Sequence, residues 1–338
     1  MRPFVSICMI VRDEEPLLAR CLESFAGAYD ELVVVDTGSV DRTPEIAREH
    51  GARVERFEWR DDFAAARNFS CSFARGEWVF TPDGDEVLQP DGVGEKLAGW
   101  LRRIPERFDK LLVEQRTVVR GETVASLFVD RIFRNRPDLR WKYRIHEVIE
   151  TPAERTAMTR DCHLLHDVAH KRRDDLRVGE ERERMYLRAL SLDIEDHPGD
   201  PRPVFYLAET LHGAGRHAEA LQEFERYFEL SEGSEPPRRA AAFRDAAAAA
   251  GASGDDARRR TYLYRSLEQD WRQAETYRAL GELAMHHGNR EEATHWLDVA
   301  ARCEAASAGP RARPGAPAGD EPGRSRHPDR GKKRPHRR

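Results

Sequence analysis

The chain has 338 residues, of which 39% are hydrophobic and 35% charged, and its formal net charge is −5. This length allows two domains, and the five cysteines are scattered without a Cys-x-x-Cys pair, which argues against a disulfide framework or a zinc site and favours a reducing compartment. No apolar stretch approaches the roughly 20 residues that span a bilayer, and acidic residues from Asp13 onward interrupt the apolar start of the chain, so we expect a cytoplasmic protein without a signal peptide.

The first 90 residues alternate short apolar runs with helical patterns. Strands are predicted at residues 4–11, 32–35, 53–57 and 78–82. Helices are predicted from Pro16, from Thr43 to about residue 49, and between residues 61 and 75. This β-α-β-α-β-α-β order predicts a parallel sheet with crossover helices.

Residues 94–167 mix one more helix with further strands. The pattern predicts a helix at 94–104, strands at 111–119 and 126–133, and a short strand at 161–166. Between the last two strands, residues 141–149 carry Arg144-Ile145-His146-Glu147.

From about residue 174 to 303 the period becomes helical throughout, and small residues recur at fixed intervals. Ala208, Leu211, Gly215, Ala220 and Phe224 return 73 positions later as Gly281, Ala284, Gly288, Ala293 and Leu297. That offset is slightly more than twice a period of about 34 residues, which is the tetratricopeptide pattern of paired helices that bury their faces by stacking. Residues 242–251 and 260–267 form a degenerate middle unit.

These patterns divide the chain into an α/β domain at 1–170, helical repeats at 171–305 and a tail at 306–338. Between Arg311 and Arg338 there are ten Arg and Lys residues against three acidic ones. The tail has almost no large apolar residue, so we expect it to be disordered and solvated rather than a specific nucleic-acid site.

One short motif concentrates acidic side chains after a predicted strand. Asp83-Gly84-Asp85 follows the run at 78–82, and carboxylates at such a position suit a divalent ion and the phosphates that it neutralises. Gly and Asp are also turn residues, so for this motif taken alone a simple turn is the better interpretation.

Four motifs, taken together, resemble family 2 glycosyltransferases. They are Ser6 to Glu15 (SICMIVRDEE), Val33 to Ser39 (VVVDTGS), Asp62 to Asn68 (DFAAARN) and Asp83 to Glu86 (DGDE). The resemblance covers about residues 4–170 and implies a GT-A fold with a mostly parallel sheet, followed by an all-α tetratricopeptide-like domain. The branch that it resembles includes bacterial enzymes, among them the bacteriocin S-glycosyltransferases, and a related branch adds sugars to lipopolysaccharide cores. Asp13, Val40 and Gly84 stand where Asn, Thr and Ala are usual.

The resemblance also implies roles for individual residues. Asp85 is expected to bind Mg²⁺ or Mn²⁺, with Asp83 reaching the metal or the ribose, and His166, or less readily His163, completing the metal shell. The residues expected around the donor nucleotide are Asp36 at the uracil, Glu14 and Asp13 at the base and ribose, and Arg67 at the base or diphosphate. Turn formation or helix capping is the simpler alternative for the acids, and a surface ion pair for Arg67.

The motif Arg144-Ile145-His146-Glu147 resembles the His-Glu motif of this branch. Glu147 is the expected general base on the acceptor, with His146 as its partner or substitute, or Glu147 could merely hold Arg144. The sequence thus predicts a metal-dependent, inverting hexosyltransferase that uses a UDP-sugar, with a peptide or protein acceptor docked by the repeats, which could also form a homodimer. The rivals are a sugar transferase of lipopolysaccharide or polysaccharide assembly, with a glycan or lipid acceptor, and a repeat scaffold with an inactive GT-A domain.

Overall fold

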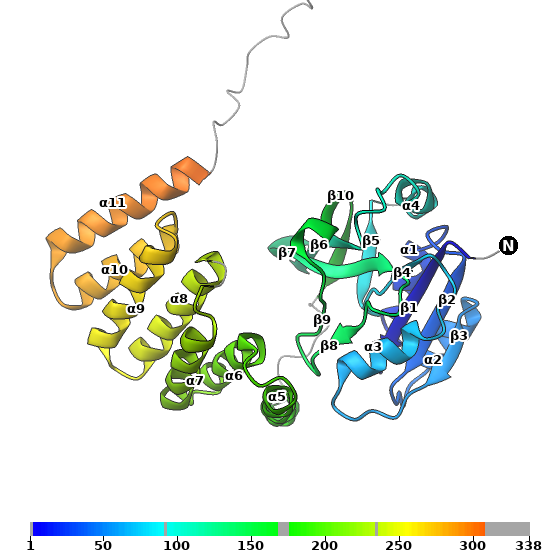
Figure 1. Cartoon of the computed structure of the whole chain (residues 1–338), viewed down its shortest axis with the longest axis horizontal. Helices are drawn as coiled ribbons and strands as arrows, with labels where there is room; N and C mark the ends of the chain where they lie inside the picture. Colours follow the sequence, from blue (N-terminus) through cyan, green and yellow to red (C-terminus); the bar gives the residue numbers. More distant parts are fainter. Residues whose placement is uncertain (1–2, 91–92, 168–175, 234–235, 308–338) are drawn as a thin grey trace, which may run out of the picture. The chain divides into compact units, whose positions relative to one another are not determined.

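The computed structural model of this chain describes residues 3–90, 93–167, 176–233 and 236–307 (Figure 1). The chain divides into two compact units, Met1–Trp271 and Arg272–Arg338. The first unit contains a large sheet and helices α1 to α9, and the second contains α10 and α11. The predicted basic tail lies outside the described residues from 308 onward, and the domain boundaries at 170 and 305 stay predictions.

The sheet of the first unit has eight strands in the order β3-β2-β1-β4-β7-β6-β10-β5. Its strands are β1 Val5–Val11, β2 Glu31–Asp36, β3 Arg53–Arg56, β4 Trp78–Phe80, β5 Glu86–Gln89, β6 Lys110–Val119, β7 Glu122–Arg134 and β10 Thr156–Asp167. A separate hairpin pairs β8 Trp141–Lys142 with β9 Val148–Ile149. Strands β1 to β4 are parallel to one another, β6 and β10 are also parallel, and β7 and β5 run antiparallel to their neighbours. The predicted α/β class with a mostly parallel sheet is therefore confirmed.

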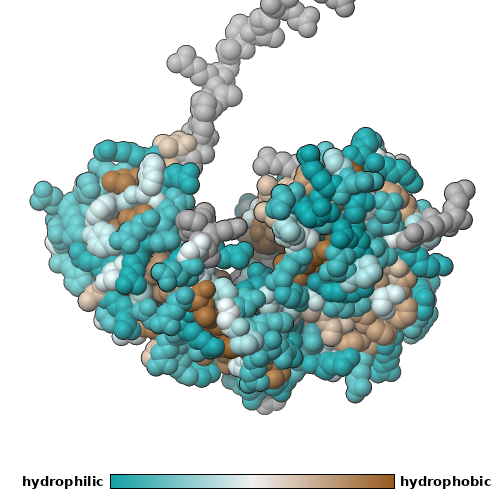
Figure 2. All heavy atoms as spheres, viewed as in Figure 1, coloured by the Kyte–Doolittle hydropathy of each residue, from teal (hydrophilic) through white to brown (hydrophobic). Residues whose placement is uncertain are grey.

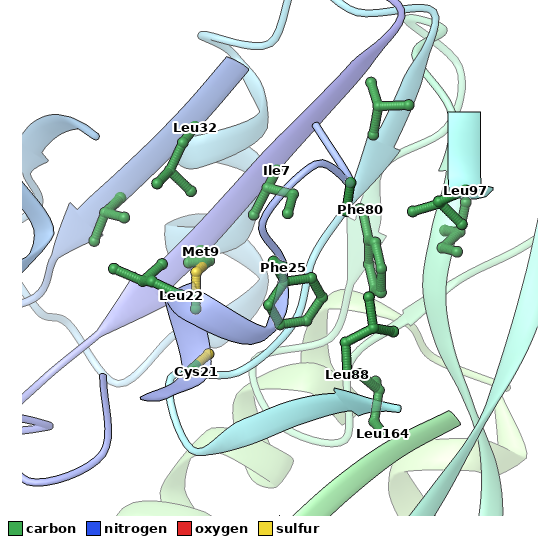
Figure 3. Packing of buried hydrophobic residues seen from close by; sticks show 14 of the residues in the cluster. Ile7, Met9, Cys21, Leu22, Phe25, Leu32, Phe80, Leu88, Leu97 and Leu164 are labelled. Carbon is green, nitrogen blue, oxygen red and sulfur yellow. The ribbon is translucent and has the colours of Figure 1, made fainter. Parts of the chain in front are cut away.

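Central strand β1 shows why an apolar run becomes a strand buried on both faces. Its alternate residues point to opposite sides, so Ile7 and Met9 join one buried cluster and Cys8 joins another. Figure 3 shows Ile7 and Met9 packed with Phe25 and Phe80, whose rings meet edge to face at 5.2 Å. Burial on both sides fixes the register of β1 against β2 and β4, and so fixes where these strands end.

Four short helices cover the sheet. They are α1 Leu18–Ser24, α2 Thr43–Glu49, α3 Phe63–Cys71 and α4 Gly94–Leu101. Helices α1, α2 and α4 contribute to the same cluster as Ile7, whereas α3 and the β8–β9 hairpin pack with Cys8 on the opposite face. The predicted helix at 61–75 is real but begins at Phe63, because the side chain of Asp62 accepts a hydrogen bond from the Ala65 backbone N–H at 2.7 Å and caps the helix.

The second half of the sheet differs in detail from the prediction. Strand β5 was not predicted, since four residues directly after an acidic turn give little periodicity. Strand β10 is twice as long as expected, 12 residues, and shifts register between Thr159 and His163. Its second half pairs antiparallel with β5, so that His166 lies opposite Glu86. This pairing places the end of β10 next to the acidic motif, which directly precedes β5.

Beyond residue 175 the described chain is helical, as predicted. The helices are α5 Leu176–Asp196, α6 Pro201–Gly213, α7 His217–Leu230, α8 Pro236–Ala252, α9 Asp256–Gln269, α10 Ala274–His286 and α11 Arg290–Ser307. In the first unit Gly215 turns the chain between α6 and α7 with φ 75°, and in the second unit Gly288 does so between α10 and α11 with the same φ. Glycine adopts this left-handed conformation without steric cost, which explains why both glycines stand at equivalent positions of the repeat.

Small residues let the second unit pack closely. A Cβ atom at Gly281 of α10 would lie 2.9 Å from Cγ of Leu297 on α11, so a larger residue here would require the Leu297 side chain to move. Leu297 is the counterpart of Phe224, which is fully buried in the first unit. The spacing of 73 residues therefore reflects a repeated way of pairing helices.

The surface is mainly hydrophilic, with small hydrophobic patches on the face drawn in Figure 2. Within the described ranges, no helix combines the length and the apolar character needed to cross a membrane.

Candidate active site

A cavity of about 560 Å³ opens where the parallel strands β1 and β4 end. Its walls come from the loops after these strands, from the loop between β8 and β9, from the end of β10 and from α5. The lining includes Val11, Glu14, Thr37, Trp59, Arg67, Asp83, Asp85, His146, Glu147, His166, Arg182 and Tyr186. We call it the strand-end cavity. It brings together residues from positions 10 to 186, all within the Met1–Trp271 unit.

Arg67 of α3 joins two of the predicted site carboxylates. Its Nη2 donates to Oδ1 of Asp83 at 2.6 Å, and its Nε donates to Oε1 of Glu147 at 2.7 Å. The guanidinium also lies over the Trp141 ring, 5.0 Å from the centroid, and its side chain is only 5% exposed. Burial lowers the pKa of Arg67, but the charges of Asp83 and Glu147 raise it by more than that, so the guanidinium stays charged. The structure therefore places Arg67 as the clamp between the acidic motif and the His146-Glu147 loop.

A second arginine, Arg131 of β7, donates hydrogen bonds to two carboxylates of the acidic motif. It donates to Asp83, and at 3.1 and 2.8 Å to the fully buried carboxylate of Glu86. Glu86 in turn accepts from the Asp83 backbone N–H at 2.8 Å and from Gln115. Burial alone would raise the pKa of Asp83, but Arg131 and Arg67 hold it well below its usual range. Asp83 is thus ionised and held in place by two cations.

Asp85 has a different environment from Asp83. Its Oδ2 lies 3.1 Å from Nε2 of His166, and both side chains line the cavity. The pairing of β10 with β5 delivers His166 to this point, whereas His163 lies 3.2 Å from Arg116 and does not line the cavity. Of the two histidines considered from the sequence, the structure brings His166 to Asp85.

The Asp85–His166 pair fits a divalent ion better than Asp83 does. Two ligands that lie about 2.1 Å from an octahedral ion at right angles are about 3.0 Å apart, close to the observed separation. Asp83 already has two arginine partners. In the part of the chain that the structure describes, no three His, Cys, Asp or Glu side chains form a metal-holding group. A site of this kind suits Mg²⁺ or Mn²⁺, which commonly take one or two protein ligands together with substrate phosphates.

The remaining predicted nucleotide residues lie at the same edge of the sheet, in unequal positions. Glu14 lines the cavity. Asp36 ends β2 and its Oδ1 accepts from the Ser39 backbone N–H at 2.9 Å, which is the turn role weighed against nucleotide binding. Asp13 has φ 53° and accepts from the Val40 backbone N–H at 2.8 Å. Thr37, rather than Asp36 or Asp13, is among the lining residues.

The loop that carries His146 and Glu147 is held by helices α5 and α6. Arg144 donates to Asp193 of α5 from both its backbone N–H and its side chain, at 2.9 and 2.7 Å. Glu147 accordingly pairs with Arg67 rather than with Arg144. His146 adopts φ 52°, and its ring stacks on Tyr206 at 3.9 Å. Asp193 of α5 and Tyr206 of α6 thus contact the loop that carries His146 and Glu147, so the repeat region helps to shape the site.

His146 keeps an exposed edge, yet its imidazole is disposed to be neutral. Loss of hydration lowers the pKa of His146 to about 4, Glu147 opposes this shift, and Arg202 and Arg182 add to it. Stacking on Tyr206 covers one face of the ring and so also favours a lower pKa. At this pKa the ring is neutral at pH 7 and is a weaker proton acceptor than a free imidazole.

Several functional-site residues were not anticipated from the sequence. Arg131 could have been noticed, because a charge within a predicted strand of mostly apolar residues calls for a buried partner. Arg182 and Tyr186 of α5 line the cavity, but no local pattern indicates that a repeat helix reaches the catalytic edge. Trp59, which donates to Asp61 at 3.0 Å, likewise gave no signal.

Part of the chain is similar to known proteins. Residues 6–159 match the family model described as Glycosyl transferase family 2. A TPR repeat-containing protein of Synechococcus elongatus is 44% identical over 150 residues, or 43% of this chain and 35% of that protein. The SPbeta prophage-derived glycosyltransferase SunS of Bacillus subtilis is 29% identical over 149 residues, or 43% of this chain and 34% of SunS.

The match to these curated relatives covers about a third of their length. Among solved structures, S. aureus TarS 1-349 is 16% identical, with 88% of this chain and 91% of that chain covered and a TM-score of 0.40, which is too low to carry an argument. Residues 6–159 of this chain therefore form a glycosyltransferase family 2 domain, which the chain joins to a tetratricopeptide-like helical region.

Proposed function

We propose that this chain is a metal-dependent, inverting glycosyltransferase that moves a sugar from a UDP-sugar to a peptide or protein acceptor. The observation that supports it most is the strand-end cavity, which holds a metal-compatible pair, Asp85 and His166, within the same walls as the Arg67–Glu147 pair. One group handles the leaving diphosphate and the other the acceptor.

Breaking the bond to a nucleotide diphosphate places negative charge on the leaving group. A divalent ion bound by Asp85 and His166 would neutralise that charge when present. The protein's own contribution is positional: Arg131 and Arg67 fix Asp83, and fixed dipoles and charges stabilise developing charge without reorganising. Asp83 in this arrangement is better placed to bind the ribose than the metal.

Glu147 is proposed as the general base. Its carboxylate is partly exposed to the cavity and accepts from Arg67 Nε. Because Arg67 is itself shared with Asp83, Glu147 is oriented by a group fixed on α3. His146, next to Glu147 in the loop, also lines the strand-end cavity.

The wider proposal has three further parts. The domain boundaries lie near residues 170 and 305, the chain works in the cytoplasm, and the repeats dock the acceptor or a second copy of the chain. The docking part is supported by the direct contacts of α5 and α6 with the catalytic loop, through Asp193 and Tyr206.

A turnover assay tests the proposed function. The purified chain is incubated with a panel of UDP-sugars and Mn²⁺, UDP release is measured, and the anomeric configuration of the product is read by NMR. We expect release with at least one donor, an inverted product, and a loss of at least about 100-fold in Glu147→Gln. Release by Glu147→Gln at the rate of the unmodified chain would contradict the assignment of the base.

A further inference from the structure

A second cavity, of about 650 Å³, lies within the same unit and shares no lining residue with the strand-end cavity. It is enclosed by the β8–β9 hairpin and helices α6 and α7. Its walls include Tyr143, Glu150, Asp200, Arg202, Tyr206 and Tyr227. We call it the Tyr227 cavity.

Two hydrogen-bond donors of this cavity lack acceptors among the described residues. Tyr227 is 2% exposed, and its buried hydroxyl makes no hydrogen bond there. Burial raises the pKa of this phenol and the nearby Ser231 hydroxyl lowers it, as a donor to the phenol oxygen would, so the phenol O–H is still without an acceptor. Nε of Arg202 is also buried without a partner. Buried donors without acceptors are uncommon and costly, so these two indicate a ligand that offers oxygen atoms.

The acids of the cavity, in contrast, already have partners. Asp200 accepts from the Tyr143 hydroxyl and from the Arg202 backbone N–H at 2.9 Å. Glu150 pairs with Lys142 at 2.6 Å and with Tyr143 at 3.0 Å. The Arg202 guanidinium has no carboxylate partner within the described ranges, and its Nη2 donates only to the His146 carbonyl at 2.8 Å. Asp200 accepts only from neutral donors here and so offsets one of the two lining cations, Arg202 and Arg238, which leaves a net positive charge to be matched.

The rest of the wall is aromatic. Arg202 lies 5.7 Å from the Tyr143 ring centroid and 5.1 Å from that of Tyr206, and Phe205 contacts the Tyr227 ring at 5.4 Å. We propose that the Tyr227 cavity binds a carboxylate-bearing segment of an acceptor peptide. An apolar side chain of the peptide packs on the aromatic wall, and its oxygens accept from Arg202 and Tyr227. That the peptide is the acceptor rests on the proposed function, whereas the binding itself does not.

Occupation of this cavity reaches the catalytic loop through two contacts. Arg202 holds the His146 backbone carbonyl, and Tyr206 stacks on the His146 ring. A ligand that engages Arg202 thereby steadies the loop next to Glu147. The two cavities are then coupled through Arg202 and Tyr206, which line the Tyr227 cavity and contact His146.

The test measures peptide binding by fluorescence anisotropy on the full chain, without nucleotide or metal. The probe is a labelled Gly-Phe-Glu-Gly-Phe-Glu-Gly peptide, compared with its Gln counterpart and with free phenylacetate as a competitor. We expect the Gln peptide to bind at least about tenfold more weakly, and Tyr227→Phe to weaken binding of the Glu peptide about two- to tenfold.

The matched control is Tyr262→Phe, because Tyr262 is equally buried but its hydroxyl donates to Glu225 and lies outside the cavity. Tyr227→Phe removes an unsatisfied hydroxyl and is expected to raise Tm by about 2–4 °C, whereas Tyr262→Phe lowers Tm and leaves binding unchanged. Equal binding of the Glu and Gln peptides, or unchanged binding by Tyr227→Phe, would overturn the proposal. Phenylacetate binding as tightly as the peptide would overturn the peptide assignment. Absence of sugar transfer alone affects only the proposed function.

Discussion

Replacing Arg67 by Met tests whether the paired arginine holds the site together. Arg67 makes two charge-assisted hydrogen bonds, at 2.6 Å to Asp83 and 2.7 Å to Glu147, each worth about 1.5–3 kcal/mol. Asp83 keeps Arg131 and is about one-third exposed, so its share is discounted. The loss falls mainly on Glu147, whose recorded partner among the described residues is Arg67 alone. We expect the free energy of unfolding to fall by about 3 kcal/mol, or Tm by about 6–12 °C.

Urea and thermal unfolding measure this loss against a surface control. Arg42→Met breaks the exposed Arg42–Glu49 pair at 3.4 Å and should change stability by no more than about 0.5 kcal/mol. The double variant Arg67→Met/Glu147→Gln should recover part of the loss, because it no longer buries an unpaired charge. A loss for Arg67→Met as small as that for Arg42→Met would refute the reasoning.

The pH dependence of the same variant has a defined sign. Asp83 has a lowered pKa in the folded chain, so its stabilising effect is present above the unfolded pKa, near 4, and is lost as pH falls through the folded value. Without Arg67 the pKa of Asp83 is lowered less. The stability gap between the two proteins should therefore narrow as pH is lowered from 5 toward 2, and a constant gap would argue against ion pairing.

Two further variants extend the account. The pKa of His146 is lowered to about 4 in the folded chain, so on acidification the imidazole of the unfolded chain is protonated first. In urea titrations the unmodified chain should therefore lose stability between pH 6.5 and 4 more steeply than His146→Gln. Parallel curves for the two proteins would contradict a neutral His146. Gly84→Ala, which restores the residue usual in the family, places a Cβ atom 3.2 Å from Glu14 Cγ and 3.3 Å from Val11 Cγ1. We expect a stability change within about 1 kcal/mol and UDP affinity within tenfold, and global unfolding would show that Glu14 cannot yield.

The sequence was most informative where local chemistry decides structure. Apolar runs ending at Val11 and Asp36 predicted strands that the structure contains, because burial on both faces leaves such runs few alternatives. The glycines at 215 and 288 recur in the sequence at the spacing of the repeat, and the structure places both in equivalent turns. In these segments the pattern and the fold depend on the same few residues.

Long-range pairing explains what the sequence could not predict. The approach of His166 to Asp85 depends on β10 pairing with the short strand β5, 80 residues away at the His166–Glu86 position. Arg131 serves Asp83 only because β7 lies beside β4. Similarly, the hydrogen bond from Arg144 to Asp193 requires α5 to pack on the loop that carries His146 and Glu147. Each of these contacts is set by topology, which leaves no local trace.

Calorimetry with UDP, in the presence and absence of Mn²⁺, tests the central claim most directly. If Asp85 and His166 hold a divalent ion against the diphosphate, Mn²⁺ should tighten UDP binding by at least about tenfold, or 1.4 kcal/mol. In Asp85→Asn this gain should vanish while Tm stays within a few degrees of the unmodified chain. UDP binding that is indifferent to Mn²⁺ in the unmodified chain would contradict the account.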